Sequence, residues 1–305
     1  MTIEIIITLL ASFLWAITNH IDKYMLCNIE NPTSNIKSLL VFSSLIAGLV
    51  LSPLWLIVSK FQISISAISL TFVFMASILY LLATYFYFKA LEKNDASIVV
   101  VMFQLIPVFS YVLSWVLFKE TLTTNQMIGS LIIISSAIII SLDFESNSNK
   151  NKLTALILMI ISSLMYALYF IFFDIAIRSS DYKAVAFWYQ ISFLLIGIIL
   201  LCLKQFRKPF IEMIKNNGKK IASLNITNEV LNLMANLMVN FANLTIPLAL
   251  ANTLNGFQGA FAFIIGAIGV LILPKIFVED LSKKIVIQKV FCIVLGIIGL
   301  IIMVN

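Results

Sequence analysis

Residues 225–243 read N-I-T-N-E-V-L-N-L-M-A-N-L-M-V-N-F-A-N, a regular series of asparagines in an otherwise apolar segment. A helix turns about 100° per residue, so asparagines four residues apart drift by only about 40° around its axis. The segment rises roughly 27 Å, close to the ~30 Å hydrocarbon core of a bilayer. It predicts a membrane-depth helix with one amide-rich side, the asparagine face, made by Asn225, Asn228, Asn232, Asn236, Asn240 and Asn243 together with Glu229.

The composition of the whole chain is that of a membrane protein. Of its 305 residues, 61% are hydrophobic and 11% are charged, and the mean hydropathy is +1.07. A soluble domain carries about 25% charged residues. Apolar runs of about 20 residues, the length that one helix needs to cross a bilayer, follow one another along the chain. The predicted fold class is an all-α polytopic membrane protein, and the lack of period-two alternation disfavours an outer-membrane barrel.

Ten membrane-spanning helices fit the apolar pattern. The polar run D-F-E-S-N-S-N-K-N-K at 143–152 is a linker between a first repeat at 1–142 and a second at 153–305, with five spans in each. Five is an odd number, so a tandem copy enters from the opposite side of the membrane and the repeats are inverted. The predicted spans are 2–21, 36–58, 67–88, 96–118, 124–142, 153–177, 184–203, 221–246, 248–273 and 285–304.

Short matches between the two halves agree with a repeat. Residues 12–16 (S-F-L-W-A) resemble residues 163–167 (S-L-M-Y-A) at an offset of 151, and Gln104 aligns with Gln258 at an offset of 154. Inverted repeats in transporters place their sites near the midplane, between the repeats. We therefore expect a central cavity.

The charges predict an orientation but no cofactor chemistry. Sixteen of the twenty Lys and Arg residues fall on one predicted side, which the positive-inside rule puts in the cytoplasm, with both termini outside. The N-terminus lacks a basic n-region and is interpreted as a retained helix in a multi-pass protein of the cytoplasmic (inner) membrane. Basic and apolar residues mix at 204–220, which is typical of an interfacial segment. One histidine and three scattered cysteines predict no metal site, and no cofactor or nucleic-acid partner is expected.

The stretch 89–142 resembles the drug/metabolite transporter superfamily, EamA type. The resemblance rests on an A-L turn before Ala96-Ser97, Pro107-Val108 in mid-span, Phe118-Lys119-Glu120 at the span's end, and Gln126 and Gly129 opening the next span. The S-x-x-W-A pattern at 12–16 agrees with it. The resemblance implies ten helices in an inverted repeat around a central cavity, and transport of small metabolites or drugs.

The asparagine face has two interpretations. Its amides either bond across helix interfaces, at about 0.6–2 kcal/mol each, or line a water-filled path and offer donors and acceptors to a polar solute. Amides facing lipid are disfavoured because each unsatisfied one costs several kcal/mol. We favour a substrate-binding role for Asn232, Asn236 and Asn240. Glu229 is a further binding residue and a candidate for proton or cation coupling, because intramembrane carboxylates are commonly functional.

Other candidate binding residues come from five further spans. Trp15 and Tyr166 occupy matching positions in the two repeats and are able to enclose a planar or cationic ligand. The alternative for each aromatic is packing between helices, and Asp174, a second coupling candidate, lies near a helix end where a solvated charge is common. The remaining candidates share polar faces with these residues or align between the repeats: Asn19, Tyr80, Gln104, Tyr111, Asn252, Asn255 and Gln258.

These observations predict a secondary transporter that moves a small polar or amphipathic metabolite by alternating access. An amide-rich wall with few buried charges fits an amino acid, a nucleobase or a nucleoside. No G-x-x-x-x-G-K-[ST] loop is present, so direct ATP drive is disfavoured. The alternative is a multidrug or organic-cation transporter; an integral membrane enzyme or lipid-handling protein is more distant, because no catalytic constellation is evident. The expected partners are a small-molecule substrate and the lipid bilayer, with the chain a monomer or a homodimer.

Overall fold

The computed structural model describes residues 2–27, 32–118, 123–141, 149–242, 254–273, 277 and 279–304. Within these residues the secondary structure is entirely helical. The chain divides into two compact units that are each built from separate segments. Unit 1 comprises Met1–Tyr24, Tyr87–Leu164 and Val230–Asn305, and unit 2 comprises Met25–Phe86 and Met165–Glu229.

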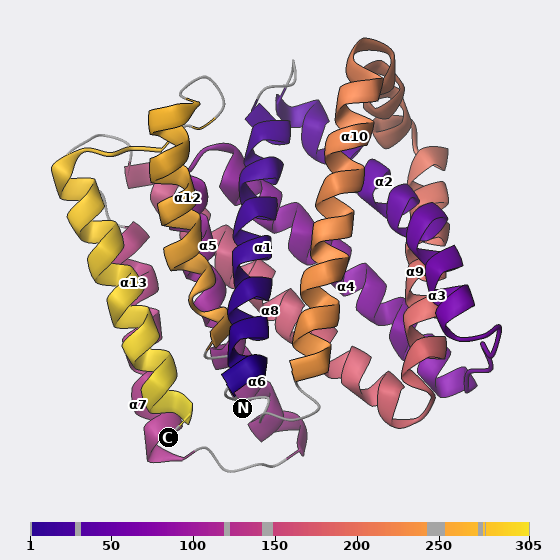
Figure 1. Cartoon of the computed structure of the whole chain (residues 1–305), viewed down its shortest axis with the longest axis horizontal. Coiled ribbons are helices and arrows are strands. Elements are labelled where there is room, and N and C mark those ends of the chain that lie inside the picture. The colour runs from indigo at the N-terminus through magenta and orange to yellow at the C-terminus, as the bar shows by residue number, and fades with distance from the viewer. Residues whose placement is uncertain are drawn as a thin grey trace. The chain divides into compact units, whose positions relative to one another are not determined.

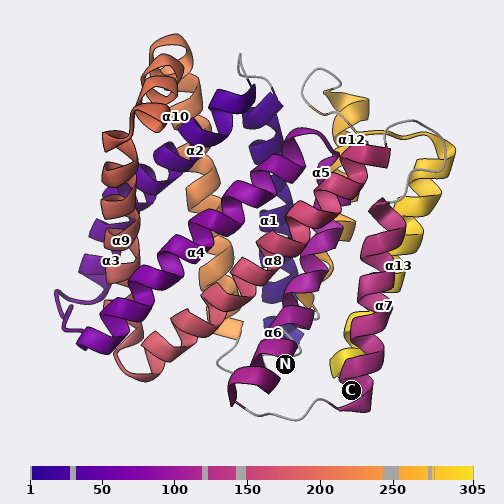
Figure 2. The same cartoon turned by 180° about the vertical axis from the view of Figure 1, so that it is seen from behind.

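Unit 1 is held together by helix pairs that are distant in sequence. Helix α13 packs along α7, and α12 packs along α5 (Figures 1 and 2). Small side chains permit the close approach, since Ala16 of α1 and Ala262 of α12 form one buried cluster with Val100 of α5. Helix α1 begins and α13 ends at the same end of this unit (Figure 1). The bounds of the helices named here are α1 Thr2–Cys27, α5 Ala96–Val101, α7 Thr124–Ser141, α12 Gln258–Ile272 and α13 Lys283–Val304.

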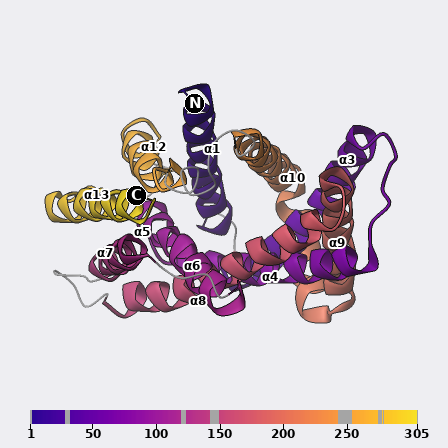
Figure 3. The ribbon, with the colours of Figure 1, turned by 90° about the horizontal axis from the view of Figure 1, so that it is seen from below.

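Unit 2 packs α2 and α3 against α9, as the view from below also shows (Figure 3). Gly48 lies directly against the backbone of Leu194 on α9, where a β-carbon would overlap it. A second contact joins Val73, Ala176 and Val185 in a buried cluster bordered by aromatic rings. The bounds are α2 Pro32–Ile46, η1 Ala47–Leu51, α3 Ser52–Val58, α4 Ala67–Glu92, α8 Asn149–Arg178, α9 Tyr182–Cys202 and α10 Lys204–Ala242.

Prolines account for two irregular turns inside the spans. Pro53 and Pro107 have no N–H to donate to the carbonyls of Leu49 and Phe103. The π-helical turn η1 contains Leu49, and the 3₁₀ turn η2 (Met102–Gln104) contains Phe103. The interruption expected from Pro107 therefore lies just before α6 (Leu105–Phe118), in the 3₁₀ turn that contains Phe103, whose carbonyl lacks an α-helical donor four residues later.

The helices agree closely with the predicted spans. Seven of the described helical segments are long and apolar enough to cross a membrane, and two shorter apolar helices, 124–140 and 258–272, lie within the predicted fifth and ninth spans. The ninth span was predicted from 248, which lies outside the described residues, and α12 begins at Gln258. The eighth prediction falls in α10, which also contains 204–220 and bends at Asn217. Helix α8 begins at Asn149, four residues before the predicted 153, so the last part of the linker is helical. The count of ten spans stays a prediction.

Candidate functional site

Unit 1 contains four of the predicted binding residues in contacts between α1, η2 and the start of α12, and we call them the amide cluster: the buried Asn19 and Gln104 and the half-buried Asn255 and Gln258. The Gln258 amide Nε2 donates to Asn19 Oδ1 at 3.3 Å. Gln104 Nε2 donates to the carbonyl oxygen of Gly256 at 3.4 Å. The Ser12 hydroxyl lies 3.3 Å from Asn255 Oδ1, to which it donates. The turn 254–257 before α12 thus brings α1 and η2 to a common polar centre.

The amide cluster leaves a donor and an acceptor unused. Among the described residues, Asn19 Nδ2 and Gln104 Oε1 are buried and have no hydrogen-bond partner, and the same holds for Ser163 Oγ, Gln190 Oε1 and Asn225 Oδ1 elsewhere in the chain. Asn19 and Gln104 are each 5% exposed. A buried polar atom without a partner costs about 1–3 kcal/mol. Each of the two cluster atoms therefore has an unused hydrogen-bonding capacity, and the Gln104 oxygen lies beside Gly296 of α13.

A glycine makes room for this arrangement. A β-carbon added at Gly296 of α13 would overlap the amide of Gln104. The Gln104 side chain can therefore occupy its position only because residue 296, on the last helix of the chain, is a glycine.

The other unit 1 candidates are placed as follows. Trp15 is half-buried on α1, and its carbonyl accepts the hydroxyl of Thr18. Tyr111 is half-buried on α6 and hydrogen-bonds to Gln126. Asn252 lies outside the described residues, as does the side chain of Asn240.

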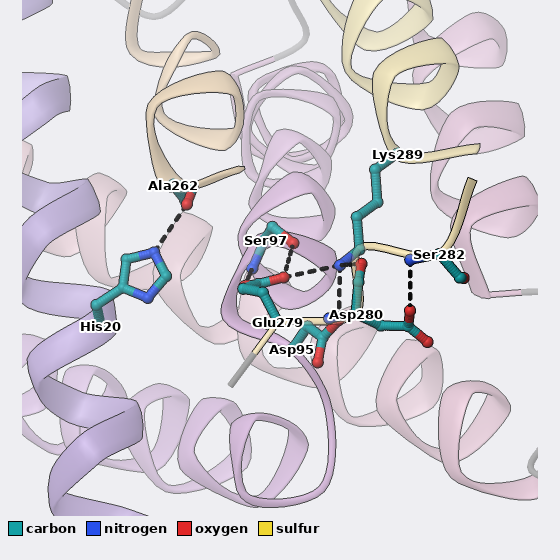
Figure 4. A network of polar contacts seen from close by, with 8 residues as sticks. All are labelled: His20, Asp95, Ser97, Ala262, Glu279, Asp280, Ser282 and Lys289. Atoms are coloured by element: carbon teal, nitrogen blue, oxygen red, sulfur yellow. Dashed lines mark hydrogen bonds and ion pairs between the residues drawn. The ribbon is translucent and has the colours of Figure 1, made fainter. Parts of the chain in front are cut away.

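A second polar group in unit 1, the ion cluster, was not anticipated from the sequence. The Lys289 ammonium donates to Asp95 Oδ2 at 2.6 Å and to Glu279 Oε2 at 2.7 Å. Glu279 also accepts the hydroxyl and the backbone N–H of Ser97, at 2.8 and 3.2 Å (Figure 4). The side chains of Lys289 and Glu279 are 1% exposed. The cluster ties the start of α5 to α13 and to the loop before it.

Two carboxylates share one ammonium in this cluster, which affects protonation. Burial, and then the neighbouring Asp95 charge, raise the pKa of the Glu279 carboxyl above its usual value, against the opposing effect of Lys289.

Gly266 provides the space for Glu279 and for His20, because a β-carbon there would lie 2.6 Å from Glu279 Cγ and 3.0 Å from His20 Cε1. His20 itself bonds through Nε2 to the Ala262 carbonyl at 2.7 Å.

Unit 2 contains a tyrosine cluster that includes two predicted residues, Tyr80 and Tyr166. The Tyr80 ring lies 5.4 Å from the ring of Tyr166 and 5.5 Å from that of Phe193, both edge-on. Tyr169 and Tyr189, which the sequence did not single out, stack at 5.8 Å and complete the group. The Tyr166 hydroxyl lies 3.1 Å from that of Thr84. Such π-faces attract organic cations as well as packing against one another.

The asparagine face changes character along α10. Asn225 is buried in unit 2 and donates to the Ser43 hydroxyl at 2.9 Å, as expected of an amide that joins helices. Asn232 is half-buried and Asn236 is exposed in unit 1, where Asn236 Nδ2 donates to the Asn232 carbonyl at 2.8 Å. Glu229 is half-buried. Asp174 pairs with Arg178 at the surface, with an N–O distance of 2.7 Å.

Metal binding finds no support in the described part of the chain. It contains no group of three or more His, Cys, Asp or Glu side chains placed to hold an ion. The polar centres described above consist of amides, hydroxyls, phenols and one ion cluster.

Comparison with known proteins gives similarities of three kinds. The sequence model of the EamA-like transporter family matches residues 2–142. An uncharacterized protein of Methanocaldococcus jannaschii is 34% identical over 97 residues, which cover 32% of this chain and 71% of that protein. A solved crystal structure is similar over 97% of this chain and 96% of its own, with a TM-score of 0.55 and 12% identity. At that identity the last similarity shows a common fold.

Proposed function

The chain belongs to the EamA-like transporter family of the drug/metabolite transporter superfamily, and from that premise we propose that it is a secondary transporter for a small polar or amphipathic metabolite. Members of this family are transporters, and the chain is a multi-pass membrane protein. The proposal adds the class of solute, the residues that bind it and the use of alternating access.

The unused donor and acceptor of the amide cluster carry this proposal. A buried Asn19 Nδ2 and a buried Gln104 Oε1 without partners in the described structure are costly unless a solute or water satisfies them. A solute that presents an acceptor to the first and a donor to the second regains that cost on binding. Amino acids, nucleobases and nucleosides all present both groups within one small molecule.

The proposed architecture is ten spans in two inverted five-span repeats, 1–142 and 153–305. Its support is the composition of unit 2, which takes 25–86 from the first repeat and 165–229 from the second. Both termini of unit 1 also lie at one end, as an even number of spans requires (Figure 1). The charge asymmetry further supports a cytoplasmic membrane location with the termini outside.

Glu229 and Asp174 remain the proposed coupling residues. Glu229 is half-buried within α10, one residue from the buried Asn228, so protonation there would change the charge of a polar helix face. Asp174 lies at the surface in a pair with Arg178, whereas Glu229 is half-buried, and this difference in burial favours Glu229 as the first residue to test.

Transport of organic cations is the second candidate function. The observation that favours it is the tyrosine cluster, in which Tyr80 meets the rings of Tyr166, Tyr169 and Phe193 at 5.4–5.5 Å. Tyrosine faces bind quaternary ammonium groups at about 0.5–2 kcal/mol per contact. This candidate predicts ligands such as choline-like or sulfonium compounds.

A thermal-shift screen of the purified protein against metabolite classes tests the proposal, followed by counterflow of each hit in proteoliposomes. A solute from the proposed classes should raise the melting temperature of the parent protein. The shift should be lost in Gln104→Met and retained in Tyr80→Leu. Counterflow of the same solute should be saturable.

Other outcomes separate the alternatives. A shift by quaternary ammonium compounds that is lost in Tyr80→Leu and kept in Gln104→Met would replace the metabolite proposal with organic-cation transport. Asn236→Ala decides the role of the asparagine face: loss of the solute shift supports a binding role, and an intact shift with a lowered melting temperature supports helix packing.

A further inference from the structure

The strongest local concentration of charge in the chain lies outside the sites described so far. Residues 204–220 contain six Lys or Arg residues and one acid, Glu212, so this stretch has a net charge of +5 against +6 for the whole protein. It forms the first part of α10 and includes the non-helical backbone of Asn217 (φ −139°) near its end. It also follows directly on α9, an apolar helix long enough to span a membrane, which ends at Cys202.

One side of this helical stretch is attached to unit 2. Phe210 lies 6.0 Å from the ring of Phe42, and the Lys37 ammonium lies 5.7 Å from the ring of Phe206. Met213 is buried on the same side, at 5% exposure. Because Phe42 and Lys37 belong to the first turns of an apolar span that begins at 36, the stretch lies where that span begins and α9 ends.

The opposite side, the basic face, is exposed and mixes cations with isoleucines. At about 100° per residue, Lys204, Lys208, Ile211 and Lys215 fall within roughly 60° of one another, flanked by Arg207 and Ile214. The four cations are exposed, and so are Ile211 and Ile214, at 43% and 42%. Exposed isoleucines among cations distinguish a lipid surface from a soluble polyanion, because acyl chains accept the apolar groups while phosphates meet the charges.

The bend at Asn217 adds a shallow, open cavity at the end of this face. Its volume is about 410 Å³, and Lys215, Lys219 and Lys220 contribute to its wall together with Asn216 and Asn217. The lining residues include three lysines and two asparagines, whose side chains carry the kind of donors that a phosphate group binds.

We propose that the basic face of residues 204–220 docks on an anionic phospholipid leaflet, with a lipid headgroup phosphate in the cavity at the Asn217 bend. Ile211 and Ile214 enter the headgroup region while the lysines contact phosphates. Each cation near an anionic membrane surface contributes about fivefold in lipid affinity at low salt. The interaction is independent of the transported solute and of the transport activity.

The test uses the full-length protein in a nonionic detergent with added lipid. Phosphatidylglycerol should raise the melting temperature at 50 mM salt, and phosphatidylcholine should not. The gain should largely disappear at 500 mM salt, where charges are screened within a few ångströms. Native mass spectrometry should show phosphatidylglycerol molecules retained on the parent protein.

A matched pair of triple variants locates the effect. Lys208→Gln, Lys215→Gln and Lys219→Gln together should weaken phosphatidylglycerol binding about a hundredfold. The control, Lys60→Gln, Lys183→Gln and Lys283→Gln, removes three exposed charges elsewhere and should bind nearly as the parent does. Ile211→Ser with Ile214→Ser should weaken binding without altering its salt dependence.

Three results would overturn the proposal. Equal losses in the two triple variants would mean that net charge alone attracts the lipid. Unchanged binding in the first variant would exclude the basic face. A melting-temperature gain reproduced by inorganic phosphate, with none from phosphatidylglycerol, would assign the cavity to a soluble anion instead.

Discussion

The ion cluster and the amide cluster are both polar groups of unit 1, but they differ in how completely their hydrogen bonds are used. Lys289 and Glu279 have close partners at each charged atom. Asn19 and Gln104 each retain one buried atom without a partner among the described residues. A fully satisfied polar group fastens helices together, whereas an atom without a partner still has a hydrogen bond to offer. Asn225 shows that one side chain can do both, because its Nδ2 donates to Ser43 while its buried Oδ1 has no partner.

Removal of the shared ammonium should have the largest effect on stability. In Lys289→Met, Asp95 and Glu279 would face each other at close range without a counterion. Breaking a buried ion pair from one side costs about 3–5 kcal/mol. The melting temperature in detergent should fall strongly, and that of the exposed control Lys283→Met should stay near the parent value. A small loss in Lys289→Met would mean that the cluster does not fasten α13.

The asparagine face offers the same contrast within one helix. Asn225→Ala removes a buried bond to Ser43 and should cost about 1–2 kcal/mol. Asn236→Ala removes an exposed amide that bonds only one turn back along its own helix, and should cost less than about 0.5 kcal/mol. Thermal melting of the two variants gives the comparison. Equal losses would mean that the exposed part of the face also holds helices together.

The ion cluster should also make the stability of the protein depend on pH, with a smaller effect than the substitutions above. The pKa of Glu279 is raised in the folded protein, because burial and Asp95 disfavour its charged form. A raised folded-state pKa contributes stability that is fully present below the unfolded pKa of 4.5 and is lost as pH rises through the folded pKa. The stability advantage of the parent over Glu279→Gln should therefore shrink as pH increases above 4.5. An advantage that grows with pH would show that Lys289 dominates instead.

The positions of the membrane spans could be predicted from the sequence, because each span depends on a local run of apolar residues. Residues 67–88 and 124–142, for example, were predicted close to the observed α4 and α7. Asn19, Gln104 and Gln258 of the amide cluster could also be singled out from the sequence, since they are polar residues in apolar helices. Their contacts could not be predicted, because the space for the Gln104 side chain depends on Gly296, nearly two hundred residues away.

Other parts of the sites depend on contacts that no local pattern encodes. Lys289 was counted as one of many membrane-flanking lysines, and only folding places it against Asp95 and Glu279. The sequence did not distinguish Tyr169 and Tyr189 from the other aromatic residues, and only the structure shows that their rings stack on each other and that Tyr169 contacts Tyr80. The asparagine face was predicted as one feature, yet its two parts lie in different units because the unit boundary falls between Glu229 and Val230.

The most direct test of the amide cluster is the affinity of the stabilising solute for two matched glutamine variants. Gln104→Met removes an amide with an unused acceptor, and Gln288→Met removes one whose Nε2 donates to the Ile139 carbonyl at 2.6 Å. The account predicts that Gln104→Met weakens solute binding about tenfold or more while its melting temperature without solute stays close to the parent value. Gln288→Met should lose stability and keep its affinity. Unchanged affinity in Gln104→Met would contradict the assignment of the site.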